Sequence, residues 1–213
     1  MRFTIALVTL ALVYWFPLRR WFGRWGSTPD ERTRRMPGDV AIPNPTHSAT
    51  HAVTIDAPAE DVWPWLVQMG YRRGGLYSYD WLDRLFRILD RPSATQVLLE
   101  FQHLAVGDKI FLGPRETLTV KSLDPNRSLV LGYNAHAFEW VWQFGLYPVN
   151  EEQTRLVSRG TERYANTVAT WLLMRVMEPD AFVMTRRMLI GGKQRAGALR
   201  ASRAGAARAN AAA

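Results

Sequence analysis

The sequence predicts an α+β domain in which a curved antiparallel sheet of about six strands wraps around a long C-terminal helix. Residues 107–164 read as short strands, with turn-forming residues every ~8–12 positions. Helical periodicity returns after Asn166, and two short helical patterns follow a first strand near His51. A sheet with one apolar face must be covered, and the long helix is the element available to cover it.

The composition is that of one folded domain with extensions. The chain has 213 residues, 47% of them hydrophobic, and nine are Trp, a residue that often lines ligand sites. There is no Cys, which excludes disulfides, Cys-ligated zinc and thiol catalysis. The absence of Cys suits either redox environment, so it does not decide the compartment.

The net charge of +8 is carried by the two ends of the chain. Residues 1–35 hold seven Arg against two acidic residues, and residues 186–213 hold seven basic residues and no acid. The folded middle is mildly acidic, which argues against a nucleic-acid partner. Basic ends beside an apolar segment suit a membrane surface that carries anionic lipid.

Residues 1–25 predict an N-terminal membrane anchor. Residues 3–18 carry no charge, and at ~1.5 Å per residue they span about 24 Å, somewhat less than a ~30 Å hydrocarbon core. Arg19 and Arg20 follow directly and could snorkel to the interface. The cluster of Arg after the segment predicts that the globular part faces the cytoplasm, at the inner membrane. A cleaved signal peptide is the alternative, but the segment ends in PLRR without an A-x-A site.

Three further regions follow the anchor. Residues 26–50 are rich in Pro and Gly and predict a linker. Residues 51–195 predict the ligand-binding domain. Residues 196–213 are rich in Ala and Arg, and we expect a frayed basic helix or a disordered tail.

The first strand, residues 51–56, leads into two helices. Asp56 is placed to cap the first helix, Pro64 is expected to kink it, and its apolar face repeats at helical spacing through Val62, Trp65, Leu66 and Met69. Ser78 or Asp80 could cap the second helix, which is expected to run to Leu89 with an apolar side formed by Trp81, Leu82, Leu85, Phe86 and Leu89.

The remaining strands are expected over residues 109–112, 116–123, 128–133, 138–147 and 154–164. The long helix then begins near Asn166. Pro179 is expected to break or kink this helix, and Gly191 with Gly192 to slacken its end.

Residues 49–83 (ATHAVTIDAPAEDVWPWLVQMGYRRGGLYSYDWLD) resemble the SRPBCC superfamily, which includes START, birch-pollen-allergen-like and polyketide cyclase/dehydrase-like proteins. More specifically, they look like a bacterial branch with an N-terminal apolar segment. The VGDKI turn (106–110), the TRL strand (154–156) and EPDAFVMTRRMLIGGKQRA (178–196) also fit, so the resemblance covers residues 24–196. It implies a helix-grip fold with a cavity between sheet and helix, and it implies no common catalytic set.

No motif for a cofactor, a metal or a nucleophile occurs. The four His lack an H-E-x-x-H arrangement, the Gly pairs lack phosphate-loop spacing, and there is no G-x-S-x-G elbow. We therefore predict no metal, no cofactor and no identified catalytic residue.

The candidate ligand contacts come from three segments. In GGLYSYDWL, Tyr77 and Tyr79 could bring hydroxyls to a cavity mouth, or Asp80 could cap a helix while Tyr77 and Trp81 are core. Alternation places the aromatic residues of 138–147 on one face, as a ligand wall or as packing for the C-terminal helix. Arg159 could face inward, with Glu139 or a ligand acid as its partner, or could face solvent. The full set of candidates is Trp65, Tyr77, Tyr79, Trp81, Tyr133, Phe138, Trp140, Trp142, Phe144 and Arg159.

Three functions remain open on this evidence. The first, which we favour, is binding or transfer of a hydrophobic small molecule or lipid at the membrane. The second is a polyketide cyclase-like enzyme that uses a cavity Tyr and an acid to move a proton. The third is a membrane-bound structural or partner-binding module whose core is filled.

Overall fold

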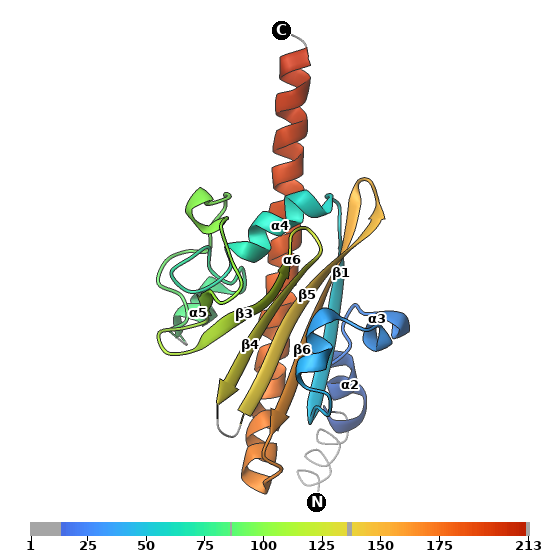
Figure 1. Ribbon diagram of the computed structural model, residues 1–213, viewed down its shortest axis with the longest axis vertical. Helices are drawn as coiled ribbons and strands as arrows, with labels where there is room; N and C mark the ends of the chain where they lie inside the picture. The colour runs from blue at the N-terminus through green and yellow to red at the C-terminus, as the bar shows by residue number, and fades with distance from the viewer. Residues whose placement is uncertain (1–13, 86, 136–137, 212–213) are drawn as a thin grey trace, which may run out of the picture.

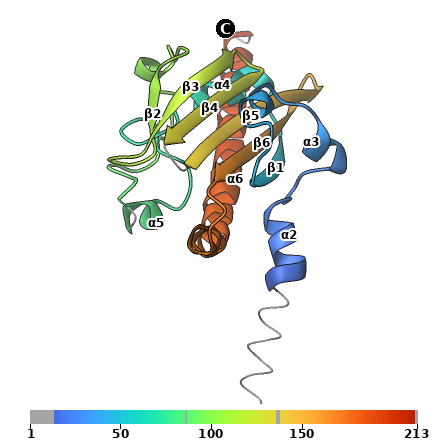
Figure 2. The same cartoon turned by 60° about the horizontal axis from the view of Figure 1, so that its bottom comes forward.

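A six-stranded antiparallel sheet arches over one long helix, α6 (Figures 1 and 2). The computed structural model describes residues 14–85, 87–135 and 138–211. The strand order is β1-β6-β5-β4-β3-β2. The α+β helix-grip architecture expected from the sequence is confirmed. The strands are β1 (His47–Ile55), β2 (Lys109–Phe111), β3 (Thr117–Asp124), β4 (Ser128–Ala135), β5 (Phe138–Asn150) and β6 (Gln153–Tyr164).

The helices lie before, within and after this run of strands. Before β1 come the π-helical turn η1 (Tyr14–Leu18), α2 (Arg19–Phe22), α3 (Pro29–Thr33) and the 3-10 turn η2 (Pro37–Ala41). Between β1 and β2 come α4 (Ala59–Val67), α5 (Asp80–Leu85) and the 3-10 turn η3 (Leu99–Phe101). The long helix α6 (Val168–Ala211) ends the described chain.

Strand β1 begins earlier than predicted, because its backbone pairs with β6 from His47 opposite Glu162 to Ile55 opposite Thr154. The other predicted strands are all present, with ends that differ by a few residues. Alternation along β5 turns Phe144 and Leu146 toward α6, where both are buried in the main core. The inner face of the sheet is therefore apolar where the pattern predicted it.

Pro179 does not break α6, which runs from Val168 to Ala211 without interruption. Pro179 has no N–H, so the carbonyl of Arg175 one turn earlier loses its helical partner. The Tyr14 hydroxyl donates a hydrogen bond of 2.8 Å to that carbonyl. The expected break is thus wrong, because a side chain from the N-terminal segment satisfies the orphaned oxygen.

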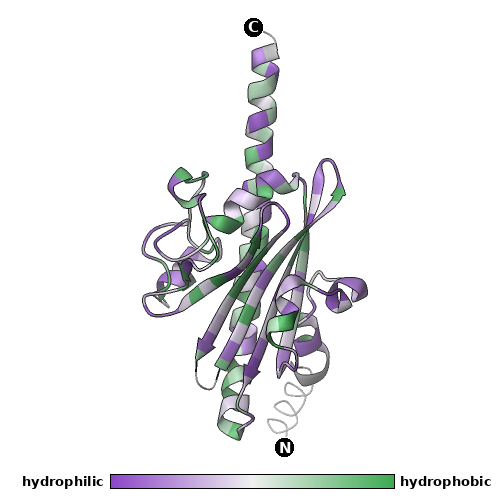
Figure 3. Ribbon diagram, in the orientation of Figure 1, coloured by the Kyte–Doolittle hydropathy of each residue, from purple (hydrophilic) through white to green (hydrophobic). Residues whose placement is uncertain are grey.

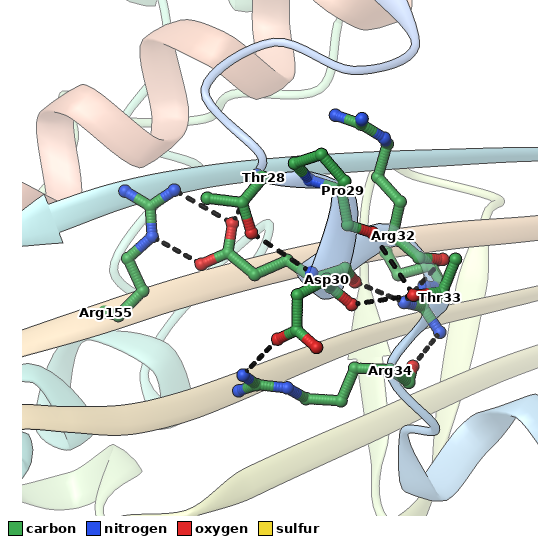
Figure 4. Close-up of polar contacts among 9 residues, drawn as sticks. Thr28, Pro29, Asp30, Arg32, Thr33, Arg34 and Arg155 are labelled. Carbon is green, nitrogen blue, oxygen red and sulfur yellow. Dashed lines mark hydrogen bonds and ion pairs between the residues drawn. The ribbon is translucent and has the colours of Figure 1, made fainter.

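The expected linker at residues 26–50 is instead a folded cover on the outer face of the sheet. Helix α3 starts with a Thr28 capping box, and Arg155 of β6 bonds Glu31 in its first turn (Figure 4). In the following turn η2, the Gly38 N–H donates to Gln143 on β5 at 2.8 Å. The sequence pattern missed this cover because its helices are each only five residues long.

Helix α5 ends at Leu85, earlier than expected. Trp81 is 65% exposed and Leu85 69% exposed, so these two members of the predicted apolar side do not pack on the core, whereas Leu89 is buried. Asp56 does not cap α4 either, since Pro58 occupies the N-cap position. Asp56 bonds Gln153 and Lys193 instead.

The tail at residues 196–211 is helical, as the last part of α6, and projects beyond the sheet (Figure 1). Ala196 is fully buried, and Arg203 pairs with Asp61 in the first turn of α4. The packed part of the helix therefore extends beyond the predicted domain end at residue 195. Within the described residues, no helix is both long and apolar enough to cross a bilayer. Residues 1–13 of the predicted anchor lie outside the described residues.

Candidate functional site

A cavity of about 420 Å³ lies between the inner face of the sheet and α6. The sheet contributes aromatic and aliphatic side chains, and one face of α6 closes the other side. Most lining residues are apolar: the set is Leu76, Ser78, Ile88, Leu112, Glu116, Thr117, Leu118, Tyr133, Phe138, Trp140, Trp142, Ala181, Met184, Thr185 and Met188. A cavity of this size and lining is typical of small-molecule sites.

The aromatic wall of the cavity comes from β5. Trp140 and Trp142 stack with ring centroids 5.6 Å apart, and Phe144 packs against Trp142 at 4.9 Å. The Trp142 indole N–H donates to Ser158 on β6 at 3.0 Å. Because the sheet satisfies this polar atom, the ring can present apolar surface to the cavity.

One buried carboxyl lies directly behind the cavity wall. The Ser78 hydroxyl, which lines the cavity, donates to Asp83 at 2.5 Å. Asp83 is fully buried. Burial raises the pKa of its carboxyl above the ordinary value, and the nearby Asp80 and Asp180 carboxylates raise it further. Ser78 and Asp83 thus form a polar, hydrogen-bonded pair at a mostly apolar wall.

A second cavity of about 140 Å³ adjoins the first and shares Trp140, Trp142, Ala181 and Thr185 with it. Its other walls carry charge. Arg19 pairs with Glu178 at 2.8 Å, and the His47 ring lies 3.5 Å from the same carboxylate. The two cavities therefore lie side by side, and the second has charged groups in its wall that the first lacks at that side.

His51 closes part of the second cavity without offering a free charge. Its ring Nε2 lies 2.7 Å from the carbonyl oxygen of Phe22. Burial lowers the pKa of the His51 imidazole below its ordinary value. The ring is therefore neutral at physiological pH and donates to that carbonyl.

Four of the predicted ligand contacts line the main cavity: Tyr133, Phe138, Trp140 and Trp142. Phe144 is fully buried in the core behind them. The period-two alternation of β5 predicted these contacts, because it placed the aromatic residues on the face that meets α6.

The residues predicted from GGLYSYDWL mostly lie elsewhere. The Tyr77 hydroxyl donates to the backbone carbonyl of Trp65 at 3.0 Å, so these two residues pack together away from the main cavity. Burial raises the pKa of the Tyr77 phenol. Tyr79 lies beneath the Arg187 guanidinium, and Trp81 faces solvent. No hydroxyl of these residues is placed at the cavity mouth, and the alternative of a core Tyr77 is the arrangement found.

Arg159 lies on the outer face of the sheet and not in the cavity. It is buried beneath the cover formed by residues 26–50, and its guanidinium bonds Asp39 at 2.6 Å and Thr50 at 3.2 Å. The suggested partner Glu139 pairs with Arg163 instead. The sequence could not reveal Asp39 as the partner, because residues 26–50 showed no periodicity that would place them on the sheet.

The helical side of the cavity was not predicted from the sequence. Ala181, Met184, Thr185 and Met188 recur at i, i+3, i+4 and i+7, which is one face of α6. This spacing is present in the sequence. It was not used to predict a cavity wall, because a break was expected at Pro179. Among the described residues, no group of three or more His, Asp or Glu side chains could hold a metal ion.

Comparisons with known proteins return likenesses of fold alone. No model of a known protein family matches the sequence, and no curated protein matches it. Zhui aromatase/cyclase from Streptomyces sp. R1128 is 19% identical with a TM-score of 0.39, over 70% of this chain and 93% of that one. A protein from Mesorhizobium loti is 16% identical (TM-score 0.41; 70% and 96% covered). A protein from Thermus thermophilus is 14% identical (TM-score 0.42; 71% and 98% covered).

The helix-grip fold expected from the sequence is present. The strand order and the single long C-terminal helix carry this statement. The similar structures share too little identity to bear on activity or ligand.

Proposed function

We propose that the protein binds a hydrophobic small molecule or lipid in the main cavity, with transfer to or from the membrane as an extension of that role. The observation that carries the proposal is the mostly apolar cavity of about 420 Å³ between the sheet and α6. A core filled by its own side chains, as a purely structural module would have, leaves no such space.

The ligand is expected to be amphiphilic. The stacked Trp140 and Trp142 offer flat apolar surface to its body. The adjoining second cavity offers Arg19, His47 and Glu178 to a polar group. A molecule that extends from one cavity into the other would satisfy both ends, because charged groups in a cavity favour a polar partner.

Membrane attachment is the second part of the proposal. The uncharged segment at residues 3–18 and the Arg residues that follow it support an anchor with the folded domain at the cytoplasmic surface. A hydrophobic ligand partitions into the bilayer, so a binding protein held there meets it at high local concentration.

A proton-transfer enzyme is the second candidate, and the Ser78–Asp83 pair is the observation that favours it. Burial raises the pKa of the Asp83 carboxyl, so it holds a proton more readily than an exposed carboxyl and could pass it through the Ser78 hydroxyl to a bound molecule. Tyr77 does not supply the cavity Tyr of this hypothesis, since its hydroxyl donates to the Trp65 carbonyl, whereas Tyr133 lines the cavity.

Titration of the full-length protein with cis-parinaric acid tests the binding proposal. Excited tryptophan transfers energy to this polyene fatty acid when it sits beside the Trp140 and Trp142 wall. We expect saturable, one-to-one energy transfer. Ala181→Trp adds bulk to a residue that lines both cavities and should weaken binding by at least about tenfold.

Ala204→Trp is the matched control, because Ala204 is exposed on the projecting part of α6. It adds the same side chain far from the cavity and should leave the titration unchanged. Equal titrations for the wild type and Ala181→Trp would refute binding in this cavity.

A further inference from the structure

The first turns of α6 expose a row of large apolar side chains. Helical spacing places Val168, Leu172, Val176 and Val183 along one face, with Leu173 and Met177 beside them. We call these six residues the apolar stripe. Their exposed fractions range from 41% at Val183 to 83% at Val168. No described part of the chain covers the stripe, although apolar area of this size normally meets a partner.

The apolar stripe lies at the end of the molecule where the N-terminal segment joins the domain (Figure 1). Figure 3 shows hydrophobic colour on this start of α6, below the sheet. Tyr14 bonds the Arg175 carbonyl within the same stretch of helix, and Phe22 stacks on Phe182 at 4.7 Å. The described end of the predicted anchor thus runs alongside the apolar stripe.

A basic surface adjoins the same end. Arg19, Arg20, Arg24 and Arg32 line a polar hollow of about 400 Å³ with His47 and Thr50. Arg20 and Arg24 are exposed and have no carboxylate partner among the residues described. Exposed guanidinium groups without internal partners suit phosphate, which Arg binds in bidentate geometry.

We infer that the apolar stripe and this arginine hollow form one contact surface for an anionic phospholipid bilayer. The start of α6 lies in the interface, its side chains reach the upper acyl region, and Arg20 and Arg24 bind lipid phosphates. The inference rests on the membrane part of the proposed function and adds a surface that the anchor alone does not require. A protein partner is less suited, because the apolar stripe lies beside Tyr14, the first described residue of the uncharged segment, and beside the exposed Arg20 and Arg24.

This docking has a consequence for the cavity. Met177 belongs to the apolar stripe and also lines the second cavity, together with Met174 and Glu178. A docked stripe therefore brings the edge of the second cavity at Met177 close to the bilayer surface. A ligand could pass from the membrane into the cavity without crossing water.

The absence of Cys makes a direct test simple. Single variants Leu172→Cys, Val176→Cys and Val149→Cys of the full-length protein are labelled with the polarity-sensitive fluorophore NBD. Val149 is 56% exposed at the end of β5 and serves as the matched apolar control. The proteins are mixed with vesicles of phosphatidylcholine and phosphatidylglycerol, and bound protein is isolated by flotation. Brominated lipid and aqueous iodide then serve as quenchers.

We expect brominated lipid to remove about half of the emission or more at positions 172 and 176, and iodide to quench only position 149. Floating protein whose labels at 172 and 176 are quenched by iodide would overturn the inference while leaving the anchor intact. Labels shielded from both quenchers would also overturn it, since the N-terminal segment or a second copy would then cover the apolar stripe. If the protein does not float with the vesicles, both the inferred contact surface and the membrane part of the proposed function are wrong. The proposal of ligand binding in the cavity is tested separately, by the titration.

Discussion

Gly191 shows how one residue sets the distance between α6 and the segment before α5. A Cβ atom at this position would lie 2.3 Å from the backbone oxygen of Tyr77. The backbone at Tyr77 is itself held in the left-handed region, with φ of 59°. The pair of glycines expected to loosen the end of the helix instead allows close packing in its middle.

Gly191→Ala is expected to lower the free energy of unfolding by about 1–3 kcal/mol, because the added methyl group forces α6 away from Tyr77. Gly192→Ala is the control, since nothing lies within 4 Å of its Cβ. That variant should gain about 0.5–1 kcal/mol from better helix propensity. Urea denaturation measures the free energy of unfolding of both variants. If both substitutions change it in the same direction, the close approach of α6 to Tyr77 is contradicted.

Asp83 makes stability depend on pH. Burial raises the pKa of its carboxyl in the folded state, so ionisation favours the unfolded chain. The destabilisation is absent below the unfolded pKa of about 4 and grows as pH rises through the folded pKa. Asp83→Asn keeps the hydrogen bond from Ser78 and removes the charge. The Tm of the wild type should fall relative to this variant as pH rises from about 4 to 8.

Asp61 and Asp180 also have raised pKa values, but they are present in both proteins. The difference between the two Tm profiles therefore reports Asp83 together with its electrostatic coupling to Asp80 and Asp180. Parallel profiles over this pH range would show that Asp83 is not perturbed as described.

At the scale of elements, α6 depends on the N-terminal segment at Pro179. Tyr14→Phe removes the hydrogen bond to the Arg175 carbonyl and should cost about 1 kcal/mol in the wild type. In a Pro179→Ala background the restored N–H can bond that carbonyl itself, so the same change should cost close to nothing. A double-mutant cycle measured by denaturation gives the coupling. Equal costs in both backgrounds would refute this account of the intact helix.

The cover over the outer sheet face depends on Arg159. Its guanidinium bonds Asp39 at 2.6 Å and the backbone carbonyl of Glu31 at 2.7 Å. Arg159→Met leaves these groups unpaired and should cost about 3–5 kcal/mol. Arg163→Met, on the same face of β6, breaks the exposed pair with Glu139 and should cost about 0–1 kcal/mol. Similar losses for the two variants would show that the cover contributes little.

The elements differ in how well the sequence predicts them, and the differences have physical causes. Strands β3 to β6 follow from runs of strand-forming residues that are separated by turn residues. The aromatic wall on β5 follows from the period of two along that strand. The cover at residues 26–50 does not follow from a sequence period. Its short helices are held by individual side-chain contacts, such as that of Glu31 with Arg155. The site on α6 was hidden by Pro179, because local rules cannot know that Tyr14 satisfies the freed carbonyl.

At the scale of the whole molecule, the two ends of α6 have different surroundings. Its start carries the apolar stripe beside the N-terminal segment, its middle closes the cavities, and its end projects as a basic helix (Figure 1). The proposed membrane contact, the polar cavity and the apolar cavity follow one another along this helix. This order fits a protein that takes an amphiphile from a bilayer and holds it against Trp140 and Trp142.

Native mass spectrometry of the purified full-length protein shows whether the cavity holds a hydrophobic molecule. Comparison with Ala181→Trp, purified identically, removes the contribution of lipid or detergent held elsewhere. We predict a stoichiometric adduct on the wild type that organic extraction identifies as an apolar or amphiphilic compound, and its loss from Ala181→Trp. A wild-type protein that carries no adduct, and stays empty when offered lipids, fatty acids and polyketides, would contradict ligand binding in the cavity.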